Sequence, residues 1–300
     1  MNIPTQSNKD IFQKYSAALE WMKEIGVNLN LGRTQHYRKI LEFSIKIKND
    51  EIRKESEKNA FPDYVSSMLE IHDFINIYDA FYSTPKNQLA HIVAKLQEGV
   101  NGPINANDET EKSTKARNFL FEAIVAAKAH RPIKGIEAIL DAESDTGIGI
   151  DKKKLWIECK RITSMGKIEA NVRTASNQLE SIINKHYGSG HRGIVALEIT
   201  KLINPENEIY VTQNDSHLAA SSNALMDRFI EDYSEIWQKL YKRKNKKIIG
   251  TIIRFALISS SEARKILVYT SQWAMNPRRG ISDSDINIQK LLVSNLNEIS

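Results

Sequence analysis

The chain has 300 residues, of which 41% are hydrophobic and 26% charged, with a formal net charge of +5 and a pI near 9.0. This length allows one or two buried cores, and the mild basic excess is compatible with a nucleic-acid partner without proving one. The only cysteine, Cys159, excludes a disulfide framework and a zinc site built from cysteines.

Hydropathy excludes membrane classes. Residues 1–9 are polar and lack the apolar core of a signal peptide. No run of about 18 apolar residues is present to cross a bilayer. We therefore expect a cytoplasmic protein with no membrane partner.

The first third of the chain has the period of amphipathic helices. Apolar residues recur at three and four positions in Ile11–Met22, Tyr37–Ile45 and Tyr64–Phe81, and a fourth helix is expected at 85–98. His72 falls near one apolar stripe, where a core histidine is commoner than a ligand. We expect an all-α N-terminal domain over 1–112 that targets, senses or regulates, and through which a partner protein would bind.

Glycine, proline and asparagine cluster without periodicity between Gly99 and Thr114, which is typical of a linker. The second domain is then 113–300. Its expected elements are helices at 116–129, 167–185 and 219–242, a hairpin within 142–161, and strands at 193–200, 248–258 and 265–271. This alternation predicts an α/β domain whose mixed central sheet has helices on both faces.

The strand Leu155–Arg161 carries the most informative residues. Because successive strand side chains point to opposite faces, Glu158 and Lys160 share a face with Trp156. The other face holds Leu155, Ile157 and Cys159, which predicts core contacts. A charged pair on an apolar strand is costly unless it is solvated, paired or bound to a metal. Asp145 is expected on the first arm of the same hairpin, before a polar turn at 151–154.

Asp145 and the run Glu158-Cys159-Lys160, in the order helix, strand, hairpin with the acids, helix, strand, resemble the PD-(D/E)XK, or restriction-endonuclease-like, nuclease superfamily. Ser144 stands where the family name has proline. The resemblance covers about 115–200 well and the C-terminal third loosely. It implies a restriction-endonuclease-like mixed sheet flanked by helices, here preceded by the helical domain.

The resemblance also implies a site for Mg²⁺ or Mn²⁺. Asp145 and Glu158 would supply carboxylates and Cys159 its backbone carbonyl, since Mg²⁺ prefers oxygen ligands. The metal would lower the pKa of a bound water and polarise the phosphoryl group. Lys160 would lie by the attacking water and the scissile phosphate.

Two helix residues extend the implied site. Glu122, in the apolar helix 116–129, matches a family glutamate that reaches the metal, and the alternative is a solvated surface glutamate. Gln178, in the helix 167–185, matches a glutamine near the scissile phosphate, and the alternative is a side chain that faces solvent.

The expected function is a Mg²⁺-dependent phosphodiesterase that cuts DNA, as an endonuclease rather than an exonuclease. A restriction or antiphage-defence setting follows by analogy only, and a homodimer would suit double-strand cutting. Two alternatives stay open. One is a non-catalytic nucleic-acid or protein-binding module that keeps the fold, and the other is an RNA-directed nuclease.

Three further patterns have simpler readings. Residues 188–193 fit G-x-G-x-x-G, but they follow a helix and open a strand, the reverse of a dinucleotide fingerprint. The lysine-rich segments 239–247 and 152–154 are either phosphate-binding patches or solvated charge. The Cys159 thiol points away from Glu158 and Lys160, which favours a core thiol over a nucleophile.

Overall fold

The computed structural model describes residues 5–29, 32–46, 50–110, 113–186 and 188–298, and for 50–62 it describes the backbone alone. The chain forms two compact units. The first comprises Met1–Leu120, Asn204–Leu218 and Leu257–Thr270, and the second comprises Phe121–Ile203, Ala219–Ala256 and Ser271–Ser300. The expected boundary at residue 112 lies outside the described residues, so the division at 112/113 stays a prediction.

The first unit contains the expected helices. They are α1 (Asn8–Glu24), α2 (Arg33–Lys46), α3 (Asp50–Phe81) and α4 (Ala90–Gly99), followed by the start of α5 (Lys115–Ala129). A capping box begins α1, because Ser7 and Asp10 each accept the other's backbone N–H. The predicted start of the third helix near Tyr64 was wrong, because α3 begins at Asp50. Its first turns are polar and precede Pro62, so they carry no apolar period.

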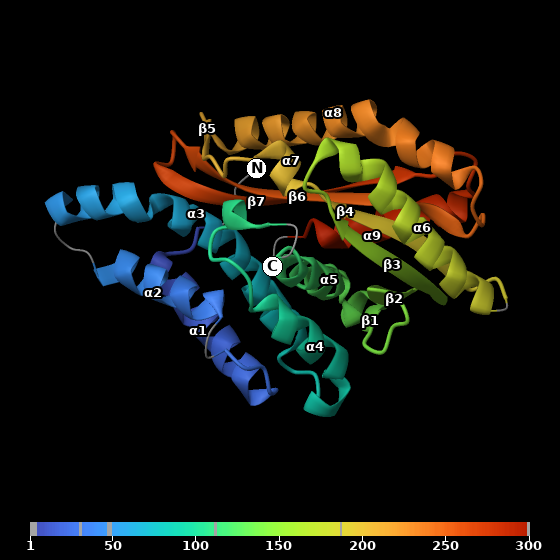
Figure 1. Cartoon of the computed structure of the whole chain (residues 1–300), viewed down its shortest axis with the longest axis horizontal. Coiled ribbons are helices and arrows are strands. Elements are labelled where there is room, and N and C mark those ends of the chain that lie inside the picture. Colours follow the sequence, from blue (N-terminus) through green and yellow to red (C-terminus); the bar gives the residue numbers. More distant parts are fainter. Residues whose placement is uncertain (1–4, 30–31, 47–49, 111–112, 187, 299–300) are drawn as a thin grey trace. The chain divides into compact units, whose positions relative to one another are not determined.

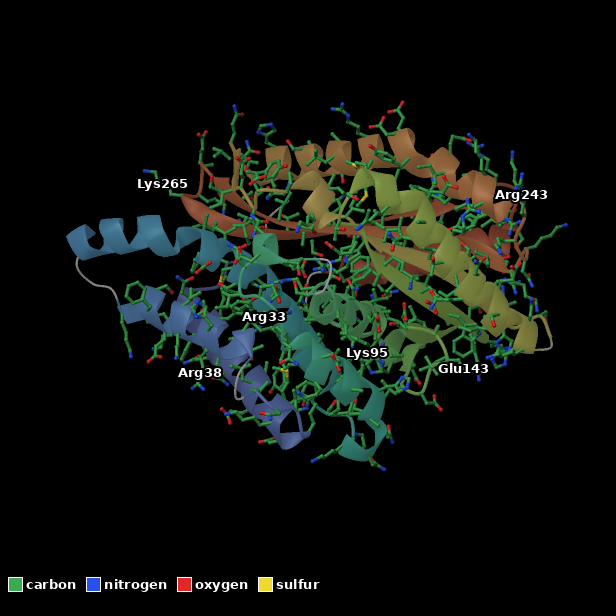
Figure 2. The ribbon with its side chains drawn as sticks, in the orientation of Figure 1. Arg33, Arg38, Lys95, Glu143, Arg243 and Lys265 are labelled. Atoms are coloured by element: carbon green, nitrogen blue, oxygen red, sulfur yellow. The ribbon has the colours of Figure 1, made fainter. Side chains whose placement is uncertain are left out.

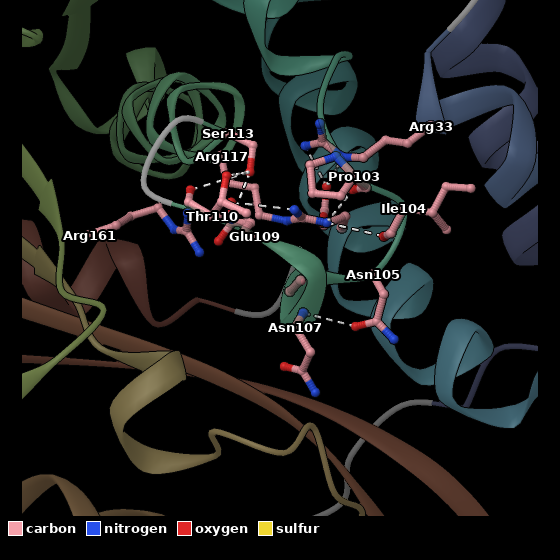
Figure 3. A network of polar contacts seen from close by, with 12 residues as sticks. Arg33, Pro103, Ile104, Asn105, Asn107, Glu109, Thr110, Ser113, Arg117 and Arg161 are labelled. Carbon is pink, nitrogen blue, oxygen red and sulfur yellow. Dashed lines mark hydrogen bonds and ion pairs between the residues drawn. The ribbon is translucent and has the colours of Figure 1, made fainter.

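Two arginines and two glutamates, Arg33, Arg117, Glu70 and Glu109, form a buried network in this unit, and Figure 3 labels both arginines and Glu109. Nε of Arg33 and Nε of Arg117 each donate to Glu70 at 2.6 Å, one to each carboxylate oxygen. Arg117 also donates to the carbonyls of Pro103 and Ile104. The network therefore ties α2, α3 and the loop before α5 together. Burial would raise the pKa of Glu70, but Arg117 and Arg33 outweigh it and hold that pKa below its usual value.

The second unit is built on a mixed sheet (Figure 1). Its strands lie in the order β1-β2-β3-β4-β6, and β7 pairs with β6. β1, β2 and β3 are antiparallel neighbours, whereas β3, β4 and β6 run parallel. The bounds are β1 (Ile136–Ile139), β2 (Thr146–Ile150), β3 (Lys153–Arg161), β4 (His191–Glu198), β6 (Ile248–Ser261) and β7 (Ile266–Pro277). In the first unit, β5 (Tyr210–Thr212) pairs with Ser259–Ser261.

Helices lie on both faces of this sheet, as the sequence predicts. α6 (Ile168–Lys185) packs on β4, because a Cβ added at Gly193 would meet Ile183 at 3.0 Å and Leu179 at 3.4 Å. Gly193 pairs with Trp156, so α6 covers the face that carries Trp156 and Glu158. On the other face, Thr146 donates to the backbone carbonyl of Glu122 in α5.

Three further helices complete the described chain, of which the sequence predicts only α8. They are α7 (Thr200–Ile203), α8 (Asp215–Tyr241) and α9 (Asp283–Leu296). β4 and β6 are buried on both faces, which is what their continuous runs of apolar, β-branched residues predict. Both C-terminal strands extend further than expected. Within the described part of the chain, no helix combines the length and apolar character needed to cross a membrane.

Candidate functional site

A tight hairpin sets the geometry of the site. Its turn is Asp151-Lys152, and both residues have positive φ, 46° and 58°. Two such residues match a type I′ turn, whose twist suits paired strands. The resulting register pairs Gly147 with Trp156 and Thr146 with Ile157.

One step beyond that register, Asp145 falls opposite Glu158. Asp145 immediately precedes β2, which begins at Thr146, and so lies at the end of the first arm of the hairpin. The backbone N–H of Cys159 in β3 donates to Oδ2 of Asp145 at 2.8 Å. The Asp145 side chain, and not a backbone carbonyl, is thus the acceptor at this end of the β2–β3 pair. The Asp145 side chain is therefore held at the end of the hairpin.

Three predicted residues converge there. Nζ of Lys160 lies 3.5 Å from Oδ2 of Asp145 and 3.4 Å from Oε2 of Glu158. Glu158 is only 2% exposed, whereas the other two side chains are partly open to solvent. Glu158 and Lys160 thus form an ion pair on β3. The face that carries them is largely covered, because Trp156 on the same face is also buried.

The site has too little positive charge for its two acids. Burial, followed by the neighbouring Asp145, raises the pKa of Glu158 to about 8, although Lys160 opposes this. Burial on its own would lower the pKa of Lys160, but Asp145 and Glu158 outweigh it and raise that pKa. Two carboxylates that share one ammonium favour the arrival of a further cation.

The donor set fits Mg²⁺ or Mn²⁺. Mg²⁺ is usually held by one or two carboxylates, with water and substrate phosphate in the other positions. Asp145 and Glu158 supply such a pair. Among the described residues there is no group of three or more His, Cys, Asp or Glu side chains placed to hold a metal. The Cys159 side chain is buried, as expected for a core thiol.

The two helix candidates occupy different environments. Glu122 is buried in α5, and its backbone carbonyl lies beside Thr146, the residue after Asp145. Gln178 is exposed on α6. Its neighbour Leu179 packs at the level of Gly193, two residues before the Val195 that pairs with Glu158. The catalytic roles of both residues stay predictions.

Sequence reasoning missed a stack of three rings next to this site. The His186 and His191 rings lie 4.5 Å apart and nearly parallel, and both stack with Trp156. The indole N–H donates to Nδ1 of His191, and His186 forms an ion pair with Glu143 when protonated. The only sequence signal was a histidine on each side of the glycine-rich loop.

A charged row on the opposite face was also missed. Arg161, Glu198 and Arg254 pair across β3, β4 and β6, and all three are buried or nearly so. Nε of Arg161 lies 3.4 Å from Glu198, and Arg254 stacks over the Trp273 ring. These residues belong to separate strands, so no local pattern links them.

No family model, curated protein or solved structure matches the chain. A function must therefore be argued from the site itself. The site offers a pair of carboxylates that can bind a divalent cation and an ammonium beside them. Such an arrangement can orient a water and offset charge on an anionic substrate.

Proposed function

We propose that this chain is a metal-dependent nuclease of the PD-(D/E)XK type that hydrolyses phosphodiester bonds in DNA. The observation that carries the proposal is the convergence of Asp145, Glu158 and Lys160 on one hairpin, with both carboxylates within 3.5 Å of the ammonium. The raised pKa of Glu158 supports it, because burial and then the neighbouring Asp145 disfavour the ionised carboxylate, which a bound cation would stabilise.

The order of elements supports the same proposal. α5 is followed by the antiparallel strands β1, β2 and β3, then by α6, then by β4 parallel to β3. This is the order that the family resemblance implies, with the acids on the hairpin. The restriction-endonuclease-like fold is accordingly the finer assignment that we propose for the second unit.

The proposed mechanism uses few groups. Asp145 and Glu158 would hold the metal, and the family resemblance implies the Cys159 carbonyl and Glu122 as further oxygen donors. When bound, the metal activates a water and neutralises charge on the phosphate. Lys160 donates hydrogen bonds to the attacking water and to a phosphate oxygen, and Gln178 contacts the neighbouring phosphate. The water oxygen bonds to phosphorus as the bond to the leaving sugar oxygen breaks, and solvent takes and returns the protons.

Plasmid cleavage with Mg²⁺ or Mn²⁺ tests the proposal. We expect Asp145→Ala and Lys160→Ala each to lower the rate at least about 100-fold, the usual effect of removing one group that stabilises the transition state. The matched controls are Asp141→Ala and Lys290→Ala, which remove an exposed acid and an exposed lysine. Undiminished cleavage by both site variants would remove these residues from the mechanism.

The same assay addresses the alternatives. Duplex DNA, single-stranded DNA and RNA are compared side by side, and a preference for RNA would replace the DNA assignment. Nucleic-acid binding without cleavage under any metal would favour a binding module that keeps the fold. The family resemblance alone suggests an antiphage setting, a homodimer and a partner protein of the helical unit.

A further inference from the structure

Three basic segments that are far apart in the sequence meet at one edge of the sheet. Because β3, β4 and β6 are parallel, their first residues lie together. The N–H of Lys154 donates to the Gly190 carbonyl at 2.8 Å. The N–H of Gly193 donates to the Lys247 carbonyl at 2.9 Å, and Nζ of Lys247 donates to the Gly188 carbonyl.

We call this the strand-start edge. It is defined by the exposed cations of the β2–β3 turn, the end of α6 and the α8–β6 connection, which are Lys152, Lys154, Lys185, Lys242, Arg243 and Lys246. Arg243, labelled in Figure 2, marks the end of α8 on this edge.

The cations of the strand-start edge differ from their basic neighbours. Lys153 and Arg192 pair with Asp285, and Lys244 pairs with Glu180. Those residues are part of the fold. Within the described part of the chain, the six cations of the edge have no ion pair with an acid. Their positive charge is therefore not neutralised by ion pairs within the fold, and it produces a positive potential at this surface.

The pKa of His191 is affected by the positive charge of this edge. Its pKa is lowered, first by burial and then by His186, Lys154 and Lys247. Lysines from two distant segments therefore act on the same imidazole. Charge from both segments is concentrated at the glycine-rich loop and is not spread over separate surfaces.

The edge and the candidate cleavage site lie on the same strand. Lys154 and Glu158 are four residues apart on β3, which is about 13 Å along a strand. The face of β3 between them is covered by α6, and Trp156 is buried there, so the edge and the site reach solvent at opposite ends of the strand.

We propose that the strand-start edge binds the phosphate backbone of duplex DNA. The proposal rests on the nuclease function proposed above for Asp145, Glu158 and Lys160. Lysines that contact phosphate hold the duplex in position without reading its sequence. The edge therefore supplies affinity and orientation, whereas the hairpin supplies the chemistry.

The test measures binding of the full chain to a fluorescently labelled DNA duplex in EDTA, where no metal-dependent cleavage occurs. Lys152, Lys154 and Lys246 are changed together to alanine. Each phosphate contact contributes close to one unit to the slope of log K against log salt. We expect affinity to fall about 10- to 100-fold and the slope to flatten by about 2–3.

The control is a triple variant that removes the same amount of charge at exposed lysines outside the edge. Its changes are Lys14→Ala, Lys39→Ala and Lys290→Ala. Equal affinities and slopes for the two triple variants would overturn the proposal. A loss confined to single-stranded RNA would overturn the duplex-DNA assignment.

The two proposals fail separately. If Asp145→Ala binds duplex DNA normally but does not cut it, and the edge variant binds weakly, both proposals stand. If Asp145→Ala and Lys160→Ala cut normally while the edge variant binds weakly, the proposed catalytic residues are wrong and the edge remains a DNA-binding surface.

Discussion

The backbone N–H of Cys159 donates a 2.8 Å hydrogen bond to Oδ2 of Asp145, and this contact holds the carboxylate opposite Glu158. The strand that carries Glu158 and Lys160 thus also positions their partner through its own backbone. Asparagine has the same shape and can keep this bond through its Oδ1. Charge and position at the site can therefore be separated experimentally.

Asp145→Asn should keep the hydrogen bond from Cys159 and lose the negative charge. We expect a melting temperature within a few degrees of the wild type, together with a cleavage rate at least about 100-fold lower, because one metal carboxylate is gone. Asp145→Ala removes the acceptor as well and should also destabilise the hairpin. Differential scanning fluorimetry and plasmid cleavage check the pair. Cleavage by Asp145→Asn near the wild-type rate would show that the charge is dispensable.

Glu158→Gln should stabilise the metal-free protein at high pH. The pKa of Glu158 is raised in the folded state from 4.5 to about 8, so the stability that the protonated form contributes is complete below pH 4.5 and is lost as pH rises through 8. Glutamine cannot ionise. We expect a gain of about 1–3 kcal/mol in the free energy of unfolding at pH 9 and little at pH 4, since one pKa unit corresponds to about 1.4 kcal/mol.

Urea unfolding in EDTA at both pH values measures this gain. Exposed Glu169→Gln is the matched control and should show no such pH dependence. A gain that is the same at both pH values would contradict the assignment of the raised pKa to Glu158. The expected gain at pH 9 would mean that the acidic site lowers the stability of the protein, which is a common cost of function.

His72 should make the first unit sensitive to acid. Burial lowers the pKa of His72 to about 4, and its ring stacks on Tyr269 at 4.3 Å. A histidine with a lowered folded-state pKa contributes stability that is present above pH 6.5 and lost as pH falls through 4. We expect a loss on the order of 2–3 kcal/mol across this window. His72→Phe keeps the stack and should flatten the stability profile between pH 6.5 and 4, as followed by urea unfolding.

Glu70→Gln should be strongly destabilising. The change leaves the buried guanidinium group of Arg33 without its carboxylate, whereas Arg117 keeps its ion pair with Glu109 at 3.3 Å. Removing one partner of a buried ion pair costs about 3–5 kcal/mol, because the remaining charge is uncompensated. The control is Glu20→Gln, whose ion pair with Lys23 is exposed and contributes less than about 1 kcal/mol. A similar small effect for both variants in urea unfolding would show that the network is not structural.

Local patterns in the sequence determined much of the fold. The helical period predicted the helices of the first unit because packing on one side imposes that period. Alternation on β3 placed Glu158 and Lys160 on one face, and continuous apolar runs predicted the buried strands β4 and β6. The start of α3 was missed because polar first turns have no such period.

Tertiary structure alone decided how the site is charged and what surrounds it. Whether Glu158 is solvated or buried depends on α6 covering its face, and this burial raises its pKa. The stack of Trp156, His186 and His191 depends on parallel pairing of strands that lie far apart in the chain. The same pairing brings Lys154 and Lys247 to the loop 188–193. Such pairing is a long-range contact that no local period encodes. The sequence by itself determined which residues could do the chemistry, and the tertiary structure decided which of them meet.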